Sequence, residues 1–428
     1  MIEIIKEKAK INKFLETLEL RCQVDQDKYF EVVQKIVKDV RNRKDEALLE
    51  YTKKFDFIDA DLTDIEIPQN ILEAAFNNLD KEMQEVLTLA RDRIIDFHVH
   101  QKQTTWLTEF ENGESMGQKI TPLKRVGVYV PGGKASYPSS VLMNVIPAKV
   151  AGVEEIIMVT PSQQGIVAEI VLAAAYVAGV TKVFKIGGAQ AIAALAYGTA
   201  VIPKVDKIVG PGNIYVALAK RLVYGEVDID SFAGPSEILI IADDEANSEF
   251  VAADLLGQAE HDVLASSILL TDSPKLALNV LKSLNAIYIT ASRKDILKES
   301  LSKYSKIIIV ESIKEAIDIA NEIAPEHLEM AVAEPTKYLD EIKNAGAIFL
   351  GNYTPEAIGD YLAGPNHVLP TAKTARFSSV LNVEDFVKKS SILYFTKESL
   401  NKISDKAIKF AKIEGFDMHA KSLEVRKK

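Results

Sequence analysis

Val126-Gly-Val-Tyr-Val130 is a short apolar run, and the turn residues Pro131-Gly132-Gly133 follow it at once. The same pattern of an apolar run followed by a helical stretch continues along the chain, with runs at 156–160, 182–186, 207–209, 238–242, 267–271, 306–310, 328–332 and 347–350. Fully apolar strands that alternate with helices indicate parallel sheets covered by helices on both faces. The sequence therefore predicts an α/β fold.

Both ends of the chain differ from this α/β region. Residues 3–55 have apolar side chains at helical spacing, as in 29–40, and the segment from 383 onward is charged and predicted to be helical. A chain of 428 residues is too long for one compact core. We therefore expect at least two domains, with helical extensions at the N- and C-termini.

Composition and charge exclude several classes of function. Acidic residues outnumber basic ones by 61 to 51, and this net charge of −10 argues against a nucleic-acid partner. The N-terminus lacks the apolar core of a secretory signal, and the longest apolar stretches, 141–153 and 170–180, are too short or interrupted to span a bilayer. The single cysteine, Cys22, cannot form an intrachain disulfide. We expect a cytoplasmic protein without a membrane partner.

The first segment with reactive side chains contains Asp254, Gln258 and His261. In a helix, their spacing of i, i+4 and i+7 would place all three on one face. An amide oxygen and an imidazole one turn apart can both reach one metal ion. The alternative interpretation is a solvated helix end.

The second segment is Ala324-Pro-Glu-His327. Pro325 ends the preceding helix, so Glu326 and His327 are predicted on a loop that leads into a strand. Adjacent residues project in different directions, so each can serve a separate proton transfer. A surface loop without a function is the alternative.

Two further segments join a carboxylate and an imidazole. Asp360 and His367 bracket a Gly-Pro turn, and Glu414 precedes His419 in the tail. A capped turn and a surface pair are the respective alternatives. His98 and His100 are predicted to be packing or surface residues.

No cofactor fingerprint is complete. The segment Gly210-Pro-Gly212-Asn-Ile-Tyr215 lacks the third glycine of the dinucleotide motif, and there is neither a P-loop nor a His-Glu-x-x-His motif. The glycine-rich turns either hold a dinucleotide or simply connect strands to helices. Periodicity alone does not distinguish these alternatives.

Taken together, the motifs resemble the histidinol dehydrogenase family over essentially the whole chain. They are Tyr129-Val-Pro-Gly-Gly133, Gly187-Gly-Ala-Gln-Ala-Ile192, Gly210-Pro-Gly-Asn213, Ala233-Gly-Pro-Ser-Glu237, Gln258-Ala-Glu-His261, Pro325-Glu-His-Leu-Glu329, Gly359-Asp360, Gly364-Pro-Asn-His367, and Glu414-Gly with His419. The order of these motifs along the chain makes chance similarity implausible.

The resemblance implies a role for each matching residue. It implies catalytic bases at Glu326 and His327, and NAD contacts at Tyr129, Gln190 and Asn213. The implied zinc ligands, one ion per subunit, are Gln258, His261, Asp360 and His419. The implied substrate contacts are Ser236, Gln258, His261, His327, Asp360, His367, Glu414 and His419.

The resemblance also implies an architecture and a reaction. The fold would have two incomplete Rossmann-like parallel-sheet domains, similar to aldehyde dehydrogenases, in a homodimer whose tails complete the partner's active site. The expected boundaries are a helical extension 1–25, a substrate and zinc domain 26–124 plus 236–380, an NAD domain 125–235, and a tail 381–428. The reaction would oxidise L-histidinol through L-histidinaldehyde to L-histidine with two NAD, the last step of histidine biosynthesis.

Chemical reasoning agrees with these roles. An amide, a carboxylate and two imidazoles leave coordination positions open for substrate, as a catalytic zinc requires. We expect His327 to accept the alcohol proton and Glu326 to activate the water that hydrates the aldehyde. Cys22 lies far from every glycine-rich turn, so a covalent cysteine route to the acid is disfavoured.

Two rival interpretations remain. A zinc hydrolase would use the same ligands with Glu326 as base, but it would not need a platform for a dinucleotide. A regulatory or metal-binding relative without activity should have lost Glu326 or His327, and both are present. NADH formation on mixing with NAD and amino alcohols separates the first rival from a dehydrogenase.

Overall fold

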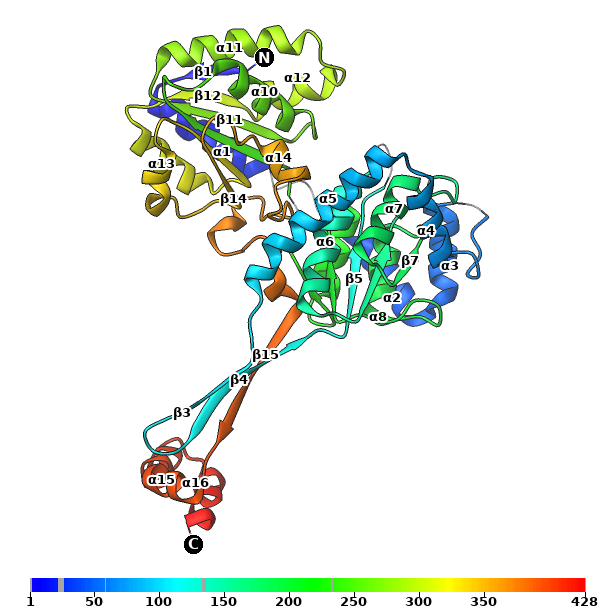
Figure 1. Cartoon of the computed structure of the whole chain (residues 1–428), viewed down its shortest axis with the longest axis vertical. Coiled ribbons are helices and arrows are strands. Elements are labelled where there is room, and N and C mark those ends of the chain that lie inside the picture. Colours follow the sequence, from blue (N-terminus) through cyan, green and yellow to red (C-terminus); the bar gives the residue numbers. More distant parts are fainter. Residues whose placement is uncertain (1, 22–26, 58, 133–135, 232–233, 428) are drawn as a thin grey trace.

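The computed structural model describes residues 2–21, 27–57, 59–132, 136–231 and 234–427, so Cys22, Gly133 and Ala233 lie outside the described residues. Two α/β lobes stand side by side, and a long arm carries the C-terminal helices away from both (Figure 1). The predicted α/β class with two largely parallel sheets is confirmed. None of the described helices is long and apolar enough to cross a membrane.

The first lobe is built on six parallel strands in the order β1-β12-β11-β10-β13-β14. Their bounds are β1 Glu3–Ile5, β10 Glu237–Ala242, β11 Ser266–Thr271, β12 Lys306–Ile309, β13 His327–Ala331 and β14 Ala347–Leu350. Alternate residues of β10 enter two different cores: Ile238 and Ile240 face one helix layer, whereas Leu239 and Ile241 face the other. Burial on both faces explains why these strands are continuous apolar runs.

The helices of the first lobe cover both faces of its sheet. One layer contains α10 (Ser248–Ala259), α11 (Pro274–Tyr288) and α12 (Lys294–Lys303). The other contains α1 (Lys8–Arg21) and α13 (Ile313–Ile323). The short helix α14 (Glu356–Tyr361) lies near the end of α10.

The second lobe has the strand order β2-β7-β6-β5-β8-β9, in which β2 alone is antiparallel to its neighbour. Its strands are β2 Glu66–Ile67, β5 Arg125–Tyr129, β6 Glu155–Val159, β7 Lys182–Phe184, β8 Lys207–Val209 and β9 Asp228–Ile229. Its helices are α2 Asp27–Arg43, α3 Asp45–Phe55, α4 Gln69–Asn78, α5 Lys81–His98, α6 Pro138–Ala151, α7 Glu169–Ala178, α8 Gly188–Tyr197 and α9 Ile214–Val223. The layer of α4–α7 covers one face and the layer of α2, α3, α8 and α9 the other.

The expected domain boundaries are wrong at two places. The N-terminal segment is not a separate helical extension, because β1 pairs with β12 and Phe14 of α1 is buried in the core of the first lobe. Residues 27–98 belong to the second lobe, because β2 pairs with β7 and α2 packs on α8 and α9. An amphipathic helix fits any apolar sheet face, so its spacing does not reveal which lobe it covers.

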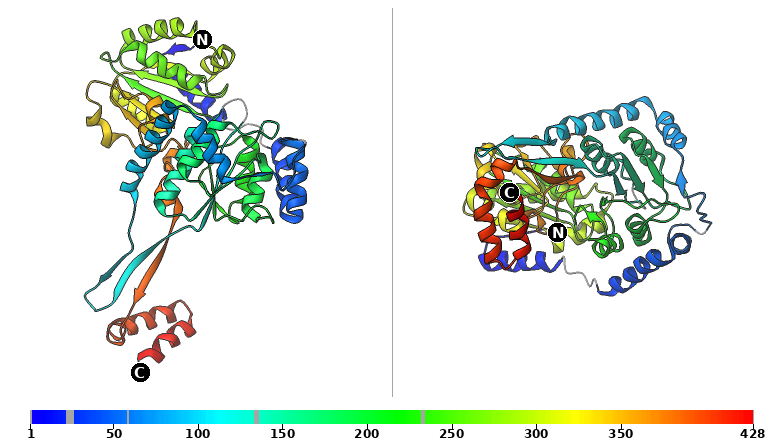
Figure 2. Two further views of the ribbon diagram at one scale, coloured as in Figure 1. Left: turned by 45° about the vertical axis from the view of Figure 1, so that its right-hand side comes forward. Right: turned by 90° about the horizontal axis from the view of Figure 1, so that it is seen from below.

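The tail is also not entirely helical. After the 3-10 helix Val383–Phe386 it contains strand β15 (Val387–Tyr394), which pairs antiparallel with β4 (Ser115–Pro122), and β3 (Trp106–Glu109) completes this three-stranded arm. Helices α15 (Lys397–Ile413) and α16 (Asp417–Glu424) follow at the far end of the arm (Figure 2). Short 3-10 helices occupy Val99–Gln101, Pro335–Glu341, Thr374–Arg376, Val383–Phe386 and Val425–Lys427.

Candidate active site

The two candidate bases lie where β13 begins. Helix α13 ends at Ile323, Ala324 has a left-handed backbone with φ 51°, and Glu326 directly precedes the strand, as Pro325 predicted. The neighbouring strand β10 begins at Glu237, which is hydrogen-bonded to both bases. The site therefore uses the amino ends of these strands, although ligands of open α/β sheets usually bind at the carboxyl ends.

Glu326 is a buried carboxyl group held by the backbone. Its Oε2 accepts a hydrogen bond from the Glu237 amide at 2.9 Å. Burial raises its pKa well above the usual value, and the nearby Glu237 and Asp360 carboxylates raise it further. Such a group becomes a stronger base than an exposed glutamate once it has lost its proton.

His327 presents one ring nitrogen as an acceptor. Its Nδ1 lies 2.9 Å from the Glu237 carbonyl oxygen, so this nitrogen carries the hydrogen and donates it. Burial lowers the pKa of the imidazole to about 4. At neutral pH the ring is therefore uncharged, and the lone pair of Nε2 is free to take a proton.

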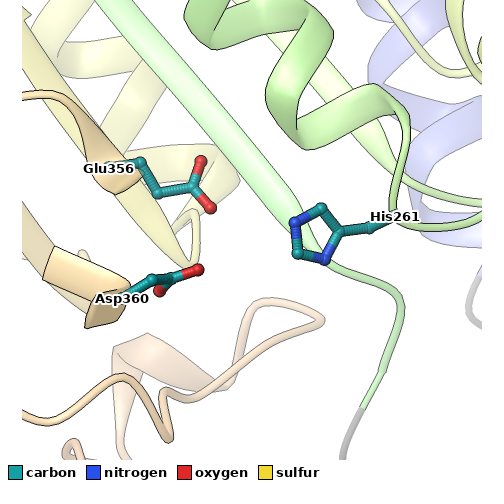
Figure 3. A group of neighbouring side chains, drawn as sticks. All are labelled: His261, Glu356 and Asp360. Atoms are coloured by element: carbon teal, nitrogen blue, oxygen red, sulfur yellow. The ribbon is translucent and has the colours of Figure 1, made fainter. Parts of the chain in front are cut away.

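His261, Glu356 and Asp360 form a cluster whose ligand atoms all lie within 4.8 Å of one another. Figure 3 shows the imidazole, which follows the end of α10, facing two carboxylates that project from α14. One nitrogen and carboxylate oxygens are donors that zinc accepts. The donor set therefore fits the ion that the resemblance implies.

Glu356 is a site residue that the sequence analysis missed. It lies one helical turn before Asp360, and this i, i+4 spacing was the available signal. Its carboxylate lies 3.8 Å from His327 Nε2. Glu356 thus connects the cluster to the candidate base His327.

Gln258 is buried beside Glu356. Its amide nitrogen donates to both carboxylate oxygens of Glu356, at 2.9 and 2.8 Å, which turns the amide oxygen away from Glu356. Asp254, predicted on the same helix face, is instead hydrogen-bonded to Glu329 of β13. Helix α10 ends at Ala259, so His261 follows the helix rather than forming part of it.

A cavity of about 260 Å³ adjoins these groups. Its walls include His327, Asp360 and His367 from the first lobe, Phe97 from the end of α5 and Gln101 from the 3-10 helix that follows it. The Nε2 atom of His367 is buried and has no hydrogen-bond partner among the described residues. Burial lowers the pKa of this imidazole, which leaves a neutral polar group beside the cavity.

The loop that carries His367 is fixed by close contacts with the second lobe. Asn366 donates from Nδ2 to the Met143 carbonyl oxygen at 2.6 Å. Gly364 has φ 110°, and a Cβ there would lie 2.6 Å from the Arg93 carbonyl oxygen. Only glycine allows this approach.

Three other predicted substrate residues, Ser236, Glu414 and His419, are not among the residues that line this cavity. Glu414 and His419 are exposed at the end of the arm, far from α10 and α14 (Figure 1). Ser236 lies directly before β10, next to Glu237, and its carbonyl oxygen accepts from the Ser266 amide at 3.1 Å.

The predicted NAD contacts gather at the carboxyl end of the second sheet. Tyr129 ends β5, Gln190 lies in the first turn of α8, and Asn213 precedes α9. From β5 the chain continues to β6 and β7 on one side and later returns to β8 on the other, so β5 and β8 form the point where the strand order reverses. Such a crevice is the usual dinucleotide site of an open α/β sheet.

These side chains have specific partners. The Tyr129 hydroxyl accepts from the Gly188 amide at 3.3 Å, and the Asn213 side chain caps α9. Gln190 Nε2 donates to Asp56 at 3.2 Å, and sequence reasoning missed this aspartate. An open cavity of about 660 Å³, lined by residues such as Gly132 and Pro161, lies beside the turns that follow β5 and β6.

Comparisons with known proteins agree with the motifs. Residues 19–427 match the histidinol dehydrogenase family. The histidinol dehydrogenase of Aquifex aeolicus is 52% identical over 99% of both chains, and that of Clostridium acetobutylicum is 51% identical over 97% of this chain and 96% of that one.

A solved structure gives the same result. The histidinol dehydrogenase of Elizabethkingia anophelis is 39% identical, covers 92% of this chain and 91% of that one, and superposes with a TM-score of 0.89. The resemblance stated from the motifs is confirmed: the chain belongs to the histidinol dehydrogenase family.

Proposed function

We propose that the protein oxidises L-histidinol through L-histidinaldehyde to L-histidine with two NAD, the last step of histidine biosynthesis. The observation that carries this proposal is one cavity bordered by a neutral imidazole acceptor, His327, and by Asp360 of the metal-binding cluster. Relatives named histidinol dehydrogenase at about half identity over the whole chain support it.

We infer that one zinc ion binds each site, held by Gln258, His261, Asp360 and His419 of the partner subunit. The mutual distances of His261, Glu356 and Asp360 support a metal at this place. Bound there, zinc supplies Lewis-acid polarisation of the alcohol oxygen and an anchor for the substrate's imidazole and amine. Ser236, His367 and the partner's Glu414 complete the proposed substrate contacts.

His327 acts in the first oxidation. Its Nε2 accepts the alcohol proton while the Glu237 carbonyl oxygen holds the opposite side of the ring. Because burial lowers the pKa of the ring to about 4, the acceptor is already neutral at physiological pH. Bound NAD would supply the acceptor for the hydride of the carbinol carbon.

Glu326 acts in the second oxidation. It removes a proton from water as the water adds to the aldehyde, and the hydrate then gives up the second hydride. The Glu237 amide fixes the carboxylate through Oε2, so the other oxygen is left for the water. Tyr129, Gln190 and Asn213 are the proposed NAD contacts.

We further propose a homodimer in which the tails are exchanged. Helices α15 and α16 expose large apolar side chains, among them Ile413 and Met418, which are 72% and 74% exposed. Burial of such surface against a second copy would stabilise a dimer. It would also bring His419 to the zinc site of the other subunit.

The test is steady-state NADH formation from L-histidinol and NAD. Activity should be abolished by a chelator and restored by zinc, while the circular dichroism spectrum stays largely unchanged, because both sheets have apolar cores of their own. Full turnover in demonstrably metal-free protein would overturn the zinc assignment. Absence of any NADH in zinc-loaded protein would overturn the proposed reaction.

A further inference from the structure

Asp56 lies directly after helix α3, and its carboxylate is held by a hydrogen bond from Gly187, which lies 131 residues further along the chain. Its Oδ2 accepts from the Gly187 amide and from Gln190 Nε2, both at 3.2 Å. Both donors lie at the start of α8, at the carboxyl end of the second sheet. Asp56 therefore contacts the turn that is proposed to hold the dinucleotide.

Among the described residues, hydrogen-bond donors reach only one oxygen of this carboxylate. Both hydrogen bonds end on Oδ2, and no described residue donates to Oδ1. A Cβ at position 187 would lie 3.1 Å from Oδ1 and 2.5 Å from the Pro161 Cβ, so only glycine fits this close approach to the carboxylate. Since a carboxylate oxygen has two lone pairs, Oδ1 can accept from a ligand.

The charge of Asp56 is not neutralised by a cation. Its partners at Gly187 and Gln190 are uncharged, and no lysine or arginine in the described ranges forms an ion pair with it. Burial raises its pKa to about 6, so the carboxylate is ionised at physiological pH. The buried Tyr129, whose pKa is raised to about 12, remains a neutral phenol beside it.

This charge determines what α8 can bind. A helix N-terminus ordinarily attracts a phosphate, but here the carboxylate already bonds the Gly187 amide at that end. A second anion beside it would be repelled, whereas a neutral hydroxyl would find an open acceptor. The position therefore suits a sugar hydroxyl and rejects a phosphate.

We propose that Asp56 selects NAD over NADP by accepting the 2′-hydroxyl of the adenosine ribose and repelling a 2′-phosphate at the same place. The inference rests on the proposed NAD site at Tyr129 and Gln190. It adds a residue that distinguishes two cofactors with the same nicotinamide chemistry.

The test is the ratio of dissociation constants for NADH and NADPH, measured by nicotinamide fluorescence with the intact zinc-loaded protein. The wild type should bind NADH more tightly. Asp56→Asn keeps an acceptor oxygen and removes the charge, so the preference for NADH should fall about tenfold or more. An unchanged ratio would overturn the inference.

Asp45→Asn is the matched control. Asp45 begins the same helix, α3, and accepts from the Ala200 amide at 2.8 Å, so its carboxylate also binds backbone but lies at the other end of the helix. The control should lower the melting temperature and leave the cofactor ratio unchanged. An equal fall of the ratio in both variants would mean that general loosening, rather than charge, is the cause.

The outcomes separate this inference from the proposed function. A wild type that binds neither cofactor overturns the proposed NAD site itself, whereas a wild type that binds both equally overturns only the role of Asp56. If Asp56→Asn fails to fold, Asp56→Glu replaces it. This variant keeps the charge and displaces the oxygen, so NADPH should stay excluded and NADH should bind more weakly; unchanged NADH affinity would contradict the inference.

Discussion

His327 offers the Nε2 lone pair because its Nδ1 proton is committed to the Glu237 carbonyl oxygen. The same residue, Glu237, donates its amide to Glu326. One peptide segment thus orients both proposed bases, and the side chain of Glu237 is anchored by an ion pair with Arg21 of α1. The same segment supports both side chains, but burial lowers the pKa of His327 and raises the pKa of Glu326. Their proposed roles in proton transfer can therefore be tested separately.

Substitution of the two bases should affect different stages of the reaction. His327→Gln removes the acceptor for the alcohol proton and should slow oxidation of histidinol by about 10²–10⁴-fold. Glu326→Gln should impair oxidation of supplied histidinaldehyde more than the first hydride transfer. Single-turnover NADH formation from each substrate measures both stages. Equal loss at both stages in both variants would refute this division of roles.

Glu356 should govern metal affinity through the orientation of Gln258. The two carboxylate oxygens of Glu356 accept hydrogen bonds from the amide nitrogen of Gln258, so the amide oxygen of Gln258 is left for the metal. Glu356→Gln weakens this arrangement and should lower zinc affinity about 10–100-fold, the usual cost of losing a residue that orients a ligand. Competition with a chromogenic chelator measures the affinity without reference to turnover.

The control for this experiment is Glu260→Gln, an exposed carboxylate next to His261 that should leave zinc affinity unchanged. A loss as complete as that in His261→Asn would make Glu356 a direct ligand. No change in affinity would mean that Gln258 is oriented without it.

Part of the site could be predicted at the level of residues. Pro325 marks the end of a helix within the sequence itself, so the place of Glu326 and His327 followed from local signals. Glu356 had only its i, i+4 spacing to Asp360 as a local signal, and the hydrogen-bond partners of Glu356 and Asp56, which are Gln258 and Gln190, lie about a hundred residues or more away. Hydrogen bonds across such separations leave no periodic signal.

At the scale of elements, β13 and α10 share a pair of carboxyl groups, of which Glu329 is buried and Asp254 half-buried. Leu328 and Met330 of β13 face α13, so Glu329 faces the opposite layer, where it meets Asp254 of α10. Burial, together with the neighbouring Asp254 carboxyl, raises the pKa of Glu329 to about 8. Glu329 also accepts the Glu356 amide at 2.8 Å, which ties this pair to the start of α14.

This pair predicts how stability depends on pH. Between 4.5 and about 8 the folded state holds a proton on Glu329 that the unfolded chain releases. The contribution to stability is therefore full below pH 4.5 and is lost as the pH rises through 8. Glu329→Gln resembles the protonated form, so its melting temperature should fall less than that of the wild type between pH 5.5 and 9.

The matched control is Glu249→Gln, which changes an exposed carboxylate on the same helix, α10. It should follow the wild-type curve. At pH 9 the free energy of unfolding of Glu329→Gln should exceed that of the wild type by at least ~1 kcal/mol. This difference corresponds to a shift of less than one pKa unit. Parallel plots of melting temperature against pH for Glu329→Gln and the wild type would disprove the raised pKa of Glu329 in the folded state.

Strands that are buried on both faces of their sheet could be predicted from the sequence. Each of the nine predicted apolar runs contains a strand. Strands such as β5 and β10 are buried on both faces, so their own composition is enough to identify them. The strands β1 and β2 are too short to show a pattern, and β15 is rich in polar residues. These strands form because of partners distant in sequence, as Val387 pairs with Pro122.

At the scale of the whole molecule, the arm separates the proposed zinc ligands of one chain. His261 and Asp360 lie in the first lobe, whereas His419 lies beyond β15 at the far end (Figure 2). Within the described residues, the extensive packing of α15 is with α16 and the last 3-10 helix, not with either lobe. A single chain thus leaves its own His419 far from its own cluster.

Complementation tests the exchange of tails. His419→Ala and His261→Ala should each be inactive alone. In a hybrid dimer, one site collects both substitutions and the other collects none. Unfolding an equal mixture together and refolding it makes roughly half of the dimers hybrid, so about a quarter of wild-type activity should return.

The control is a mixture of His261→Ala and Asp360→Ala, two residues that lie in the same lobe. Each hybrid of that pair carries one substitution in each site and should stay inactive. A first mixture that remains inactive, although hybrids are shown to form, would place the complete site within one chain.

The length of the arm also sets how far the tail reaches and which way it faces. β4 and β15 pair over eight residues each, and β3 joins them only from Gln118 outward, so 119–122 and 387–390 form a two-stranded stem. Each residue of a strand adds about 3.3 Å, and its side chain points to the opposite face from its neighbour's. Removing 119–120 together with 389–390 would shorten the reach by roughly 7 Å and keep the tail facing the same way. Removing a single cross-strand pair would turn the tail toward the opposite face, so the length of this stem can change only in steps of two without misdirecting His419.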